Sequence, residues 1–345
     1  MSAVKDILDE IDKLSPADQE RLKTILLSKT FTTAMKIKDF VTKERFANGR
    51  VCPVCGATHV VRNGHRADKA QKYLCKDCGK SFVITTNSIV SGTRKDFKIW
   101  VKYIDCMLNG FSVRKAAEEC GIHRNTAFAW RHKILDALQN MADEVTLDGI
   151  VEADETFFAI SYKGNHKKSK KFTMPREPHK RGHETHVRGL SNEKVCVPCA
   201  VNRNGMSIAK ISNTGRVSTK DLHRHYDGRI DTSATLVTDK MNSYVRFSNT
   251  NGIELVQLKT GKSKKGIYNI QHINSYHSQL KRFMKGFNGV STKYLNNYLV
   301  WHNFVNYAKE TKAEKRDILL AYVLSTLITD RNGSLSDRPA LPLVA

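Results

Sequence analysis

The distribution of apolar and polar positions divides the chain into a helical part and a mixed part. Apolar residues recur at helical spacing before residue 30 and again from about residue 97 to 139. From about residue 148, strand-like apolar segments alternate with helical ones. The strand-like segments cover residues 150–160, 195–201, 207–211 and 235–238, and the helical ones cover 218–226 and 271–287. Strands followed by helices predict a mixed α/β layer domain over residues 148–308.

Residues 1–45 are predicted to form an N-terminal helical segment. Ser15 followed by Pro16 is typical of a helix cap and first turn. Residues 1–30 hold five basic and six acidic residues, so this part is the least suited to DNA. Two interpretations stay open: a helical hairpin for protein contact or dimerisation, and a solvated helix packed on its own chain. The apolar positions at helical spacing are Val4, Ile7, Leu8, Ile11 and Leu14.

Residues 309–345 are predicted to form a C-terminal helix and a flexible tail. The longest nearly apolar run, residues 318–328, is far short of the roughly 20 residues that a membrane-spanning helix needs. It therefore predicts a buried helix and argues against a protein embedded in a membrane. Residues 331–345 contain Gly, Ser and two prolines with little periodicity, which is typical of a flexible tail.

The chain carries a large excess of positive charge. Its 57 Lys and Arg residues stand against 34 Asp and Glu residues, a formal charge of +23. Such an excess predicts a polyanionic partner, most often nucleic acid. The hydrophobic content of 40% rules out intrinsic disorder as the general class. The N-terminus shows no pattern of a secretory signal, so we expect a cytoplasmic protein whose eight cysteines stay reduced.

Two closely spaced cysteine pairs predict a zinc ribbon over residues 50–90. Cys52 and Cys55 form the first pair, and Cys75 and Cys78 form the second, nineteen residues later. Each pair can place two thiolates on one side of a tight turn, and two such turns complete the sulfur tetrahedron of structural zinc. His59 and His65 lie inside the loop, but four sulfurs already fill the coordination shell. The surrounding basic residues make this zinc ribbon a DNA-contacting module: Arg62, Arg66, Lys69, Lys72, Lys76 and Lys80.

The other four cysteines are predicted to be structural. Cys196 and Cys199 lie in a strand-like segment, where residues three apart point to opposite faces, so their thiols diverge. Cys106 and Cys120 are most simply core residues of helices.

Residues 97–140 predict a helix-turn-helix unit. Ser112 precedes a helix over residues 113–120, Gly121 supplies the turn, and a second helix runs from about 124 through 135. In a DNA-binding unit the second helix enters the major groove, with Arg131 and Lys133 near phosphates. Small helical hairpins of this pattern also occur as plain packing units. The residues expected at the start of the recognition helix are His123, Arg124, Asn125 and Thr126.

Three polar positions in the mixed domain form a candidate metal site. Asp154 lies in a strand where Val or Ile is preferred, Asp239 ends the apolar candidate strand over residues 234–238, and Asn274 lies on a later helix. Lys281 is seven residues after Asn274 and so shares its helical face. Two carboxylates and an amide oxygen suit Mg²⁺ or Mn²⁺, and such ions support in-line displacement at a phosphodiester. Lys281 is then placed to bind a phosphate.

In combination, these motifs resemble the bacterial insertion-sequence transposases that carry an N-terminal zinc ribbon and an RNase H-like DDE domain. The matching residues are the four paired cysteines, Asp154, Asp239, and Asn274 followed by Lys281, in the subgroup with Asn at the third position. The resemblance covers roughly residues 50–305. It implies a multidomain fold, Mg²⁺-dependent DNA strand cleavage and transfer at inverted-repeat ends, and Asp154, Asp239 and Asn274 as metal ligands. It also implies a homodimer or higher oligomer on double-stranded DNA, at the bacterial nucleoid.

Two basic stretches flank the candidate metal site. Residues 163–188 hold nine Lys or Arg, and residues 259–293, which include Lys264 and Lys265, hold eight Lys or Arg and no Asp or Glu. We expect these stretches to contact the DNA backbone, although basic loops are often merely solvated. Two alternative functions remain open. One is a DNA-binding regulator with an inactive RNase H-like domain, and the other is an RNase H-like nuclease without strand transfer.

Overall fold

The computed structural model divides the chain into two compact units. The first comprises Met1–Trp130 and Glu310–Thr329, and the second comprises Arg131–Lys309 and Asp330–Ala345. None of the described helices is long and apolar enough to cross a membrane. The structure describes residues 10–11, 13–15, 18–19, 37–47, 49–165, 172–175, 193–258, 264–306, 310–327, 335 and 337–343.

Little of the predicted N-terminal helical segment falls within the described residues. Ser15 behaves as predicted, because its hydroxyl accepts a hydrogen bond from the backbone N–H of Asp18 at 3.2 Å. Helix α3 spans Ile37–Arg45. The remaining positions of that segment lie outside the described residues.

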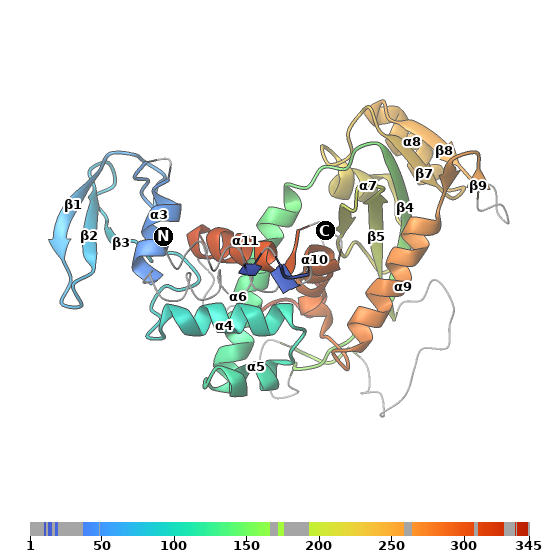
Figure 1. The fold of residues 1–345 in the computed structure, drawn as a ribbon. Helices are drawn as coiled ribbons and strands as arrows, with labels where there is room; N and C mark the ends of the chain where they lie inside the picture. Colours follow the sequence, from blue (N-terminus) through green and yellow to red (C-terminus); the bar gives the residue numbers. More distant parts are fainter. Residues whose placement is uncertain are drawn as a thin grey trace. The chain divides into compact units, whose positions relative to one another are not determined.

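The zinc ribbon contains a small three-stranded antiparallel sheet (Figure 1). Aromatic side chains form its core. The ring of Tyr73 stacks on Phe82 with centroids 5.6 Å apart, and Phe46 meets Tyr73 edge-on at 5.2 Å. So few apolar residues cannot stabilise a domain of this size without a further link such as a metal. Its strands are β1 (Val60–His65), β2 (Gln71–Cys75) and β3 (Ser81–Val83).

The helix-turn-helix unit forms much as its sequence predicts. The Ser112 hydroxyl accepts from the backbone N–H of Lys115 at 3.2 Å and caps the first helix, and Gly121 adopts φ +57° in the turn. Trp100 and Trp130 stack with centroids 3.6 Å apart in the core of the first unit. The helices of this region are α4 (Phe97–Leu108), α5 (Val113–Glu119) and α6 (Arg124–Asp143), and α6 is longer than predicted. The first unit also contains the C-terminal helix α11 (Lys312–Ser325).

The second unit is built on a five-stranded mixed sheet. Its strand order is β6-β5-β4-β7-β8, with β4, β5 and β6 antiparallel and β7 and β8 parallel to β4. This order, with two hairpin-connected antiparallel strands on one side of β4 and two parallel strands on the other, confirms the RNase H-like mixed sheet. The strands are β4 (Ile150–Ala159), β5 (Lys194–Asn202), β6 (Ser207–Ala209), β7 (Thr235–Thr238) and β8 (Glu254–Gln257).

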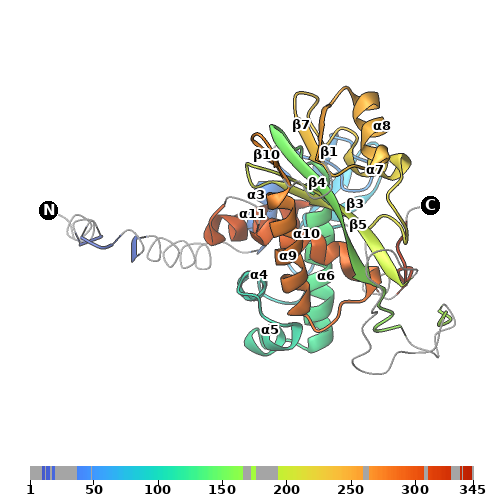
Figure 2. The same cartoon turned by 90° about the vertical axis from the view of Figure 1, so that its right-hand side faces the viewer.

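Helices cover both faces of this sheet (Figure 2). One face packs against α9 and α10 through a core that includes Ile273, Leu280 and Leu299. The other face packs against α7 and α8 through a core that includes Leu222 and Phe247. The sequence pattern missed α8, β8 and α10. The helices are α7 (Thr219–Tyr226), α8 (Asn242–Asn251), α9 (Gln271–Lys285) and α10 (Leu295–Asn306).

The buried cysteines confirm the strand geometry expected of β5. Cys196 belongs to the core under α7 and α8, whereas Cys199 belongs to the core under α9 and α10. The two thiols therefore diverge, as the prediction required. Cys106 and Cys120 are also buried.

The prediction of a flexible C-terminal tail is wrong for the described residues of that segment. Leu335 is buried, and its carbonyl accepts a hydrogen bond from the Tyr294 hydroxyl at 2.7 Å. Arg338 pairs with Asp136 at 2.5 Å, where both side chains are mostly shielded from solvent. The segment packs because Leu335 and Arg338 find partners in Tyr294 and Asp136. The weak hydrophobic periodicity of the segment does not reveal these contacts.

We predict that Arg338→Ala lowers the free energy of unfolding of the second unit by about 1–3 kcal/mol, because it leaves the shielded carboxylate of Asp136 with fewer partners. Asp136 keeps a hydrogen bond from Asn297 at 2.7 Å, which favours the lower part of this range. Urea denaturation measures the loss, with the exposed Arg216→Ala as the matched control. Equal stability of the two variants would show that the segment does not anchor to this unit.

Candidate zinc site, DNA-binding surface and active site

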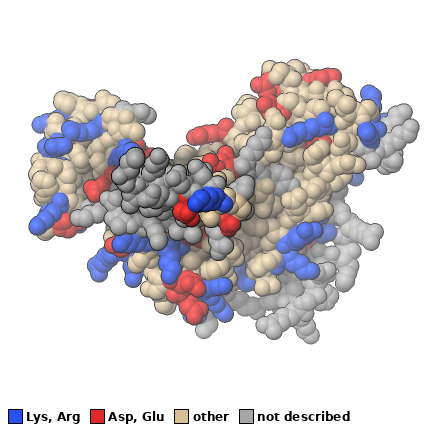
Figure 3. Space-filling view, in the orientation of Figure 1, with Lys and Arg blue, Asp and Glu red and all other residues tan. Residues whose placement is uncertain are grey.

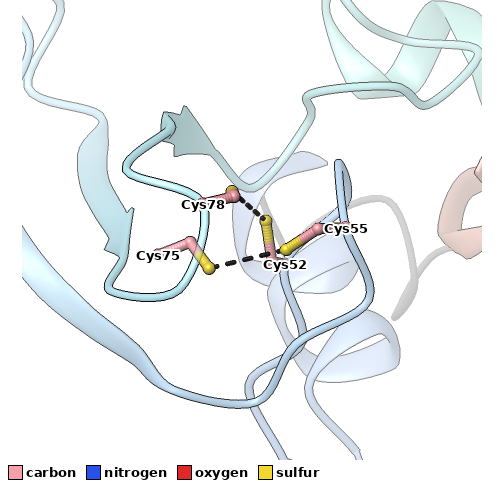
Figure 4. Close-up of side chains that lie close together, drawn as sticks. All are labelled: Cys52, Cys55, Cys75 and Cys78. Carbon is pink, nitrogen blue, oxygen red and sulfur yellow. Dashed lines mark hydrogen bonds between the residues drawn. The ribbon is translucent and has the colours of Figure 1, made fainter.

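The four paired cysteines converge to a single cluster (Figure 4). The Sγ atoms of Cys52 and Cys78 are 3.8 Å apart, those of Cys55 and Cys75 are 3.6 Å apart, and all four lie within 4.8 Å of one another. A tetrahedron of thiolates with Zn–S bonds of about 2.3 Å has S···S edges of about 3.8 Å. The cluster therefore has the size and donor set of a structural zinc site.

Tight turns set the positions of these sulfurs. The backbone N–H of Gly56 donates to the carbonyl of Cys52 at 3.0 Å, and that of Gly79 donates to the carbonyl of Cys75 at 3.0 Å. Both glycines have positive φ, +78° and +67°, which lets each chain turn back just after its cysteine pair. Hydrogen bonding from the backbone N–H of Cys78 lowers the pKa of Cys75 to about 7, which favours the thiolate that binds metal.

The start of α6 presents polar side chains to solvent. His123, Arg124 and Asn125 are exposed and Thr126 is half-buried, with the His123 Nδ1 accepting from the Asn125 backbone N–H at 3.3 Å. Arg131 differs from the prediction, because it is only 4% exposed and is not presented beside these residues. Arg131 lies seven residues, about two turns, after Arg124, and its burial comes from tertiary packing that the sequence pattern alone does not reveal.

Asp154 lies in β4, the central strand of the second unit, and Asp239 directly follows β7, its parallel neighbour. Burial raises the pKa of Asp154 to about 6, and the negative charge of Asp239 raises it further against the lowering effect of Lys281. Burial also raises the pKa of Asp239. Asp154 is half-buried and Asp239 is exposed, and the β4–β7 register places them on neighbouring strands. Two carboxylates placed in this way form a site that a divalent cation would stabilise.

Helix α9 approaches Asp154 with one face. The Nδ1 atom of His277 lies 3.8 Å from the Oδ2 atom of Asp154, and burial lowers the pKa of His277 to about 4, so its ring is neutral near pH 7. Asn274 and Lys281 stand one turn before and one turn after His277, and both are exposed. The predicted residues are thus present on facing elements, although no direct contact joins Asn274 to either aspartate among the described hydrogen bonds.

Sequence reasoning overlooked two glutamates that flank Asp154 on the same strand. The side chain of Glu152 is fully buried and accepts hydrogen bonds from the start of α9. Glu155 accepts a hydrogen bond from the Tyr244 hydroxyl of α8 at 2.7 Å. Burial raises the pKa of Glu155 to about 7, and the Tyr244 hydrogen bond offsets the repulsion of Asp154 and Asp239 only in part. The sequence did contain a signal for these glutamates. Three acidic residues within four positions of a buried strand each need a hydrogen-bond, ionic or metal partner.

The described basic residues near the site are only part of the two predicted stretches. Lys264 and Lys265 are exposed in a short hairpin of β9 (Lys264–Lys265) and β10 (Tyr268–Asn269). Lys163 instead donates to the carbonyls of Asn288 and Gly289, both at 3.1 Å. Most of residues 163–188 lies outside the described residues. On the face drawn in Figure 3, Lys and Arg side chains are also exposed over the zinc ribbon.

Comparison with known proteins matches both parts of the chain. Residues 146–304 match the family described as the ISXO2-like transposase domain, and residues 33–81 match the family described as the transposase zinc-ribbon domain. An uncharacterized protein in transposable element ISH50 of Halobacterium salinarum is 25% identical over 276 residues, covering 79% of this chain and 90% of that relative.

Solved structures with some similarity include two complexes of the Mos1 transposase. A pre-cleavage Mos1 transpososome is 10% identical and covers 60% of this chain and 79% of that chain, with a TM-score of 0.20. A Mos1 mariner paired end complex with Mn is 12% identical and covers 63% of this chain and 77% of that chain, also with a TM-score of 0.20. These TM-scores are too low to establish a shared fold.

We predict that the purified protein contains about one zinc per chain and that Cys75→Ser loses it, because three sulfurs no longer close the tetrahedron. Elemental analysis by mass spectrometry measures the metal content. Cys106→Ser is the matched control, because Cys106 is a buried thiol of α4 outside the cluster. Zinc retained in full by Cys75→Ser would exclude this cluster as the binding site.

The raised pKa of Asp154 predicts a stability effect that depends on pH. The folded protein holds this proton more tightly than the unfolded chain, whose carboxyl has a pKa of 3.8, so the charged form destabilises the fold above about pH 6. Without added Mg²⁺ or Mn²⁺, Asp154→Asn should therefore exceed the wild type in stability by about 1–3 kcal/mol at pH 8. The difference should shrink as pH falls from about 6 toward 4.

Chemical denaturation of both proteins at pH 8 and pH 4 measures this difference. Added Mn²⁺ should stabilise the wild type but not Asp154→Asn, because the variant lacks one anionic ligand. Equal stability of the two proteins at pH 8 would show that Asp154 carries no such penalty.

Proposed function

We propose that the chain is a DNA transposase of an insertion sequence, because it matches both a transposase zinc-ribbon domain and an ISXO2-like transposase domain. It binds the terminal inverted repeats of an insertion sequence and, with Mg²⁺ or Mn²⁺, cleaves DNA strands there and transfers them to a target. The observation that carries this proposal is the register of the parallel strands β4 and β7, which pairs Glu152 with Val237 and so places Asp154 and Asp239, each two residues later, on neighbouring strands. Helix α9, which bears Lys281, approaches Asp154 through His277 at 3.8 Å.

The residues around Asp154 fit a divalent metal by their chemistry. Asp154 and Asp239 offer hard anionic oxygens, the first half-buried and the second exposed. A cation would favour the charged forms of both carboxyl groups, whose pKa values are raised. Asn274 would add a neutral amide oxygen from α9. When bound, Mg²⁺ or Mn²⁺ supplies activation of the attacking hydroxyl and stabilisation of the departing oxygen.

The remaining polar residues of the site are suited to bind and orient DNA. Lys281 is exposed and close enough to Asp154 to lower its pKa, so its ammonium group can hold a phosphate near the carboxylates. His277 is neutral near pH 7 and therefore does not compete with a metal for Asp154 by its charge. Both side chains leave the carboxylate oxygens available to metal.

The DNA-contacting surfaces that we propose lie on both units. In the first unit they are the zinc ribbon and the exposed residues at the start of α6, His123 to Thr126, which would read the element end in a major groove. In the second unit they include Lys264 and Lys265, which would contact the backbone. Cleavage of two paired ends requires two active sites, so we also propose a homodimer or higher oligomer on DNA.

A cleavage and strand-transfer assay on a DNA carrying the element's own ends tests this function. We predict that Asp154→Ala and Asp239→Ala each lower the rate of Mg²⁺-dependent strand cleavage by at least about 10³-fold, because each removes an anionic ligand. Binding to the ends, measured by gel shift, should persist, since the proposed contacts lie elsewhere. Asp227→Ala, an exposed aspartate after α7, is the matched control.

Three outcomes would redirect the proposal. Cleavage unaffected by both substitutions would exclude the assigned site. End binding without any cleavage by the wild type would favour a DNA-binding regulator with an inactive domain. Hydrolysed products without joined molecules would favour a nuclease that lacks strand transfer.

A further inference from the structure

We propose that Glu152 and Glu155 are positioning residues that fix the other two catalytic elements to the strand that carries Asp154. Glu152 holds the start of α9, the helix of Asn274 and Lys281, and Glu155 holds α8, the helix that follows Asp239. This inference rests on the proposed function, because it explains what holds the three proposed metal ligands in fixed positions relative to one another.

Glu152 supplies the helix cap that α9 lacks in its own sequence. The residue at the N-cap position, Ile270, makes no side-chain cap hydrogen bond. Instead, the Oε2 atom of Glu152 accepts from the backbone N–H groups of His272 at 2.8 Å and Ile273 at 3.1 Å. Its Oε1 atom lies 2.7 Å from the Nδ1 atom of His272. A remote strand residue thereby sets the position of the first turn of α9, in which Asn274 lies.

Glu155 makes the corresponding link on the other side of the sheet. The hydroxyl of Tyr244 donates to the Oε1 atom of Glu155 at 2.7 Å, and the Tyr244 side chain is fully buried. Tyr244 lies in the first turn of α8, five residues after Asp239. The turn that carries Asp239 is thus tied at its far end to β4.

The alternation of side chains along β4 explains why two links on one strand reach two layers. Residues 152 and 154 point to the face covered by α9, whereas residue 155 points to the face covered by α8. Strand β4 is hydrogen-bonded to β5 on one side and to β7 on the other. The pairing with β7 covers residues 150–152 and the pairing with β5 covers residues 151–159, so the backbone of β4 is held at both glutamates and can serve as a reference for both helices.

The energetics favour a positioning role over a purely stabilising one. A fully buried carboxylate such as that of Glu152 must be compensated by hydrogen bonds, and apolar residues of similar volume usually stabilise a core at least as well. The carboxylates instead fix geometry, because each accepts hydrogen bonds from groups in the first turn of one helix and so sets the position of that turn relative to β4. Groups that orient metal ligands typically change metal affinity about 10- to 100-fold when removed.

The test measures Mn²⁺ affinity and DNA binding of the full chain in parallel. Glu152→Gln and Tyr244→Phe each remove hydrogen bonding with little change in volume, and His272→Ala removes an exposed partner of Glu152 should Glu152→Gln fold poorly. Glu254→Gln is the matched control, because this exposed carboxylate accepts from the Thr235 hydroxyl of the neighbouring strand at 2.8 Å. Electron paramagnetic resonance of free Mn²⁺ gives the dissociation constant, with Asp154→Ala defining the site.

We expect each positioning variant to weaken the Asp154-dependent Mn²⁺ site about 10- to 100-fold while zinc content and end binding stay at the wild-type level. Glu254→Gln should bind Mn²⁺ as the wild type does. Wild-type Mn²⁺ affinity in Tyr244→Phe and in Glu152→Gln or His272→Ala would overturn this inference alone. A wild type without any Asp154-dependent Mn²⁺ site would instead overturn the proposed function on which it rests.

Discussion

The need to compensate carboxylates buried in a central β-strand is the constraint on which the second unit depends. Strand β4 carries Glu152, Asp154 and Glu155 where a strand of this kind would otherwise hold Val or Ile. Each has a different compensation: backbone N–H groups for Glu152, a tyrosine hydroxyl for Glu155, and for Asp154 the metal that we propose. The placement of α8 and α9 against the sheet is inseparable from these partners.

The first unit depends on a different interaction, the closure of four thiolates. Its three short strands enclose an aromatic core too small to hold the ribbon together by burial alone. The turns at Gly56 and Gly79 bring the four cysteine Sγ atoms to the spacing of a tetrahedral zinc site. A structural zinc at this cluster would link two loops that carry exposed basic residues, and we propose that the same small module contributes to DNA binding.

The candidate site could be predicted from the sequence only as far as residue type and order allow. Asp154 stood out because acids are rare in buried strands, and Asp239 stood out because it ends a strand. Asn274 and Lys281 were weaker signals, since a single amide on a helix is usually exposed, and they gained weight from their order and spacing and from the family resemblance. Glu152 and Glu155 were missed because their partners, His272 and Tyr244, are about 90 to 120 residues away along the chain. No local pattern encodes such pairings.

By itself, the sequence determined the local features: the zinc turns, the capped helix at Ser112, the segments that form β4, β5, β6, β7, α7 and α9, and the overall basic charge. These follow from spacing, periodicity and composition, which act over a few residues or over the chain as a sum. The tertiary structure alone decided that Arg131 is buried, that Leu335 and Arg338 anchor the C-terminal segment, and that β4 binds two helices through its glutamates. Those outcomes depend on which distant groups meet when the sheet and its two helical layers close, and burial and hydrogen-bond partners are settled only by that closure.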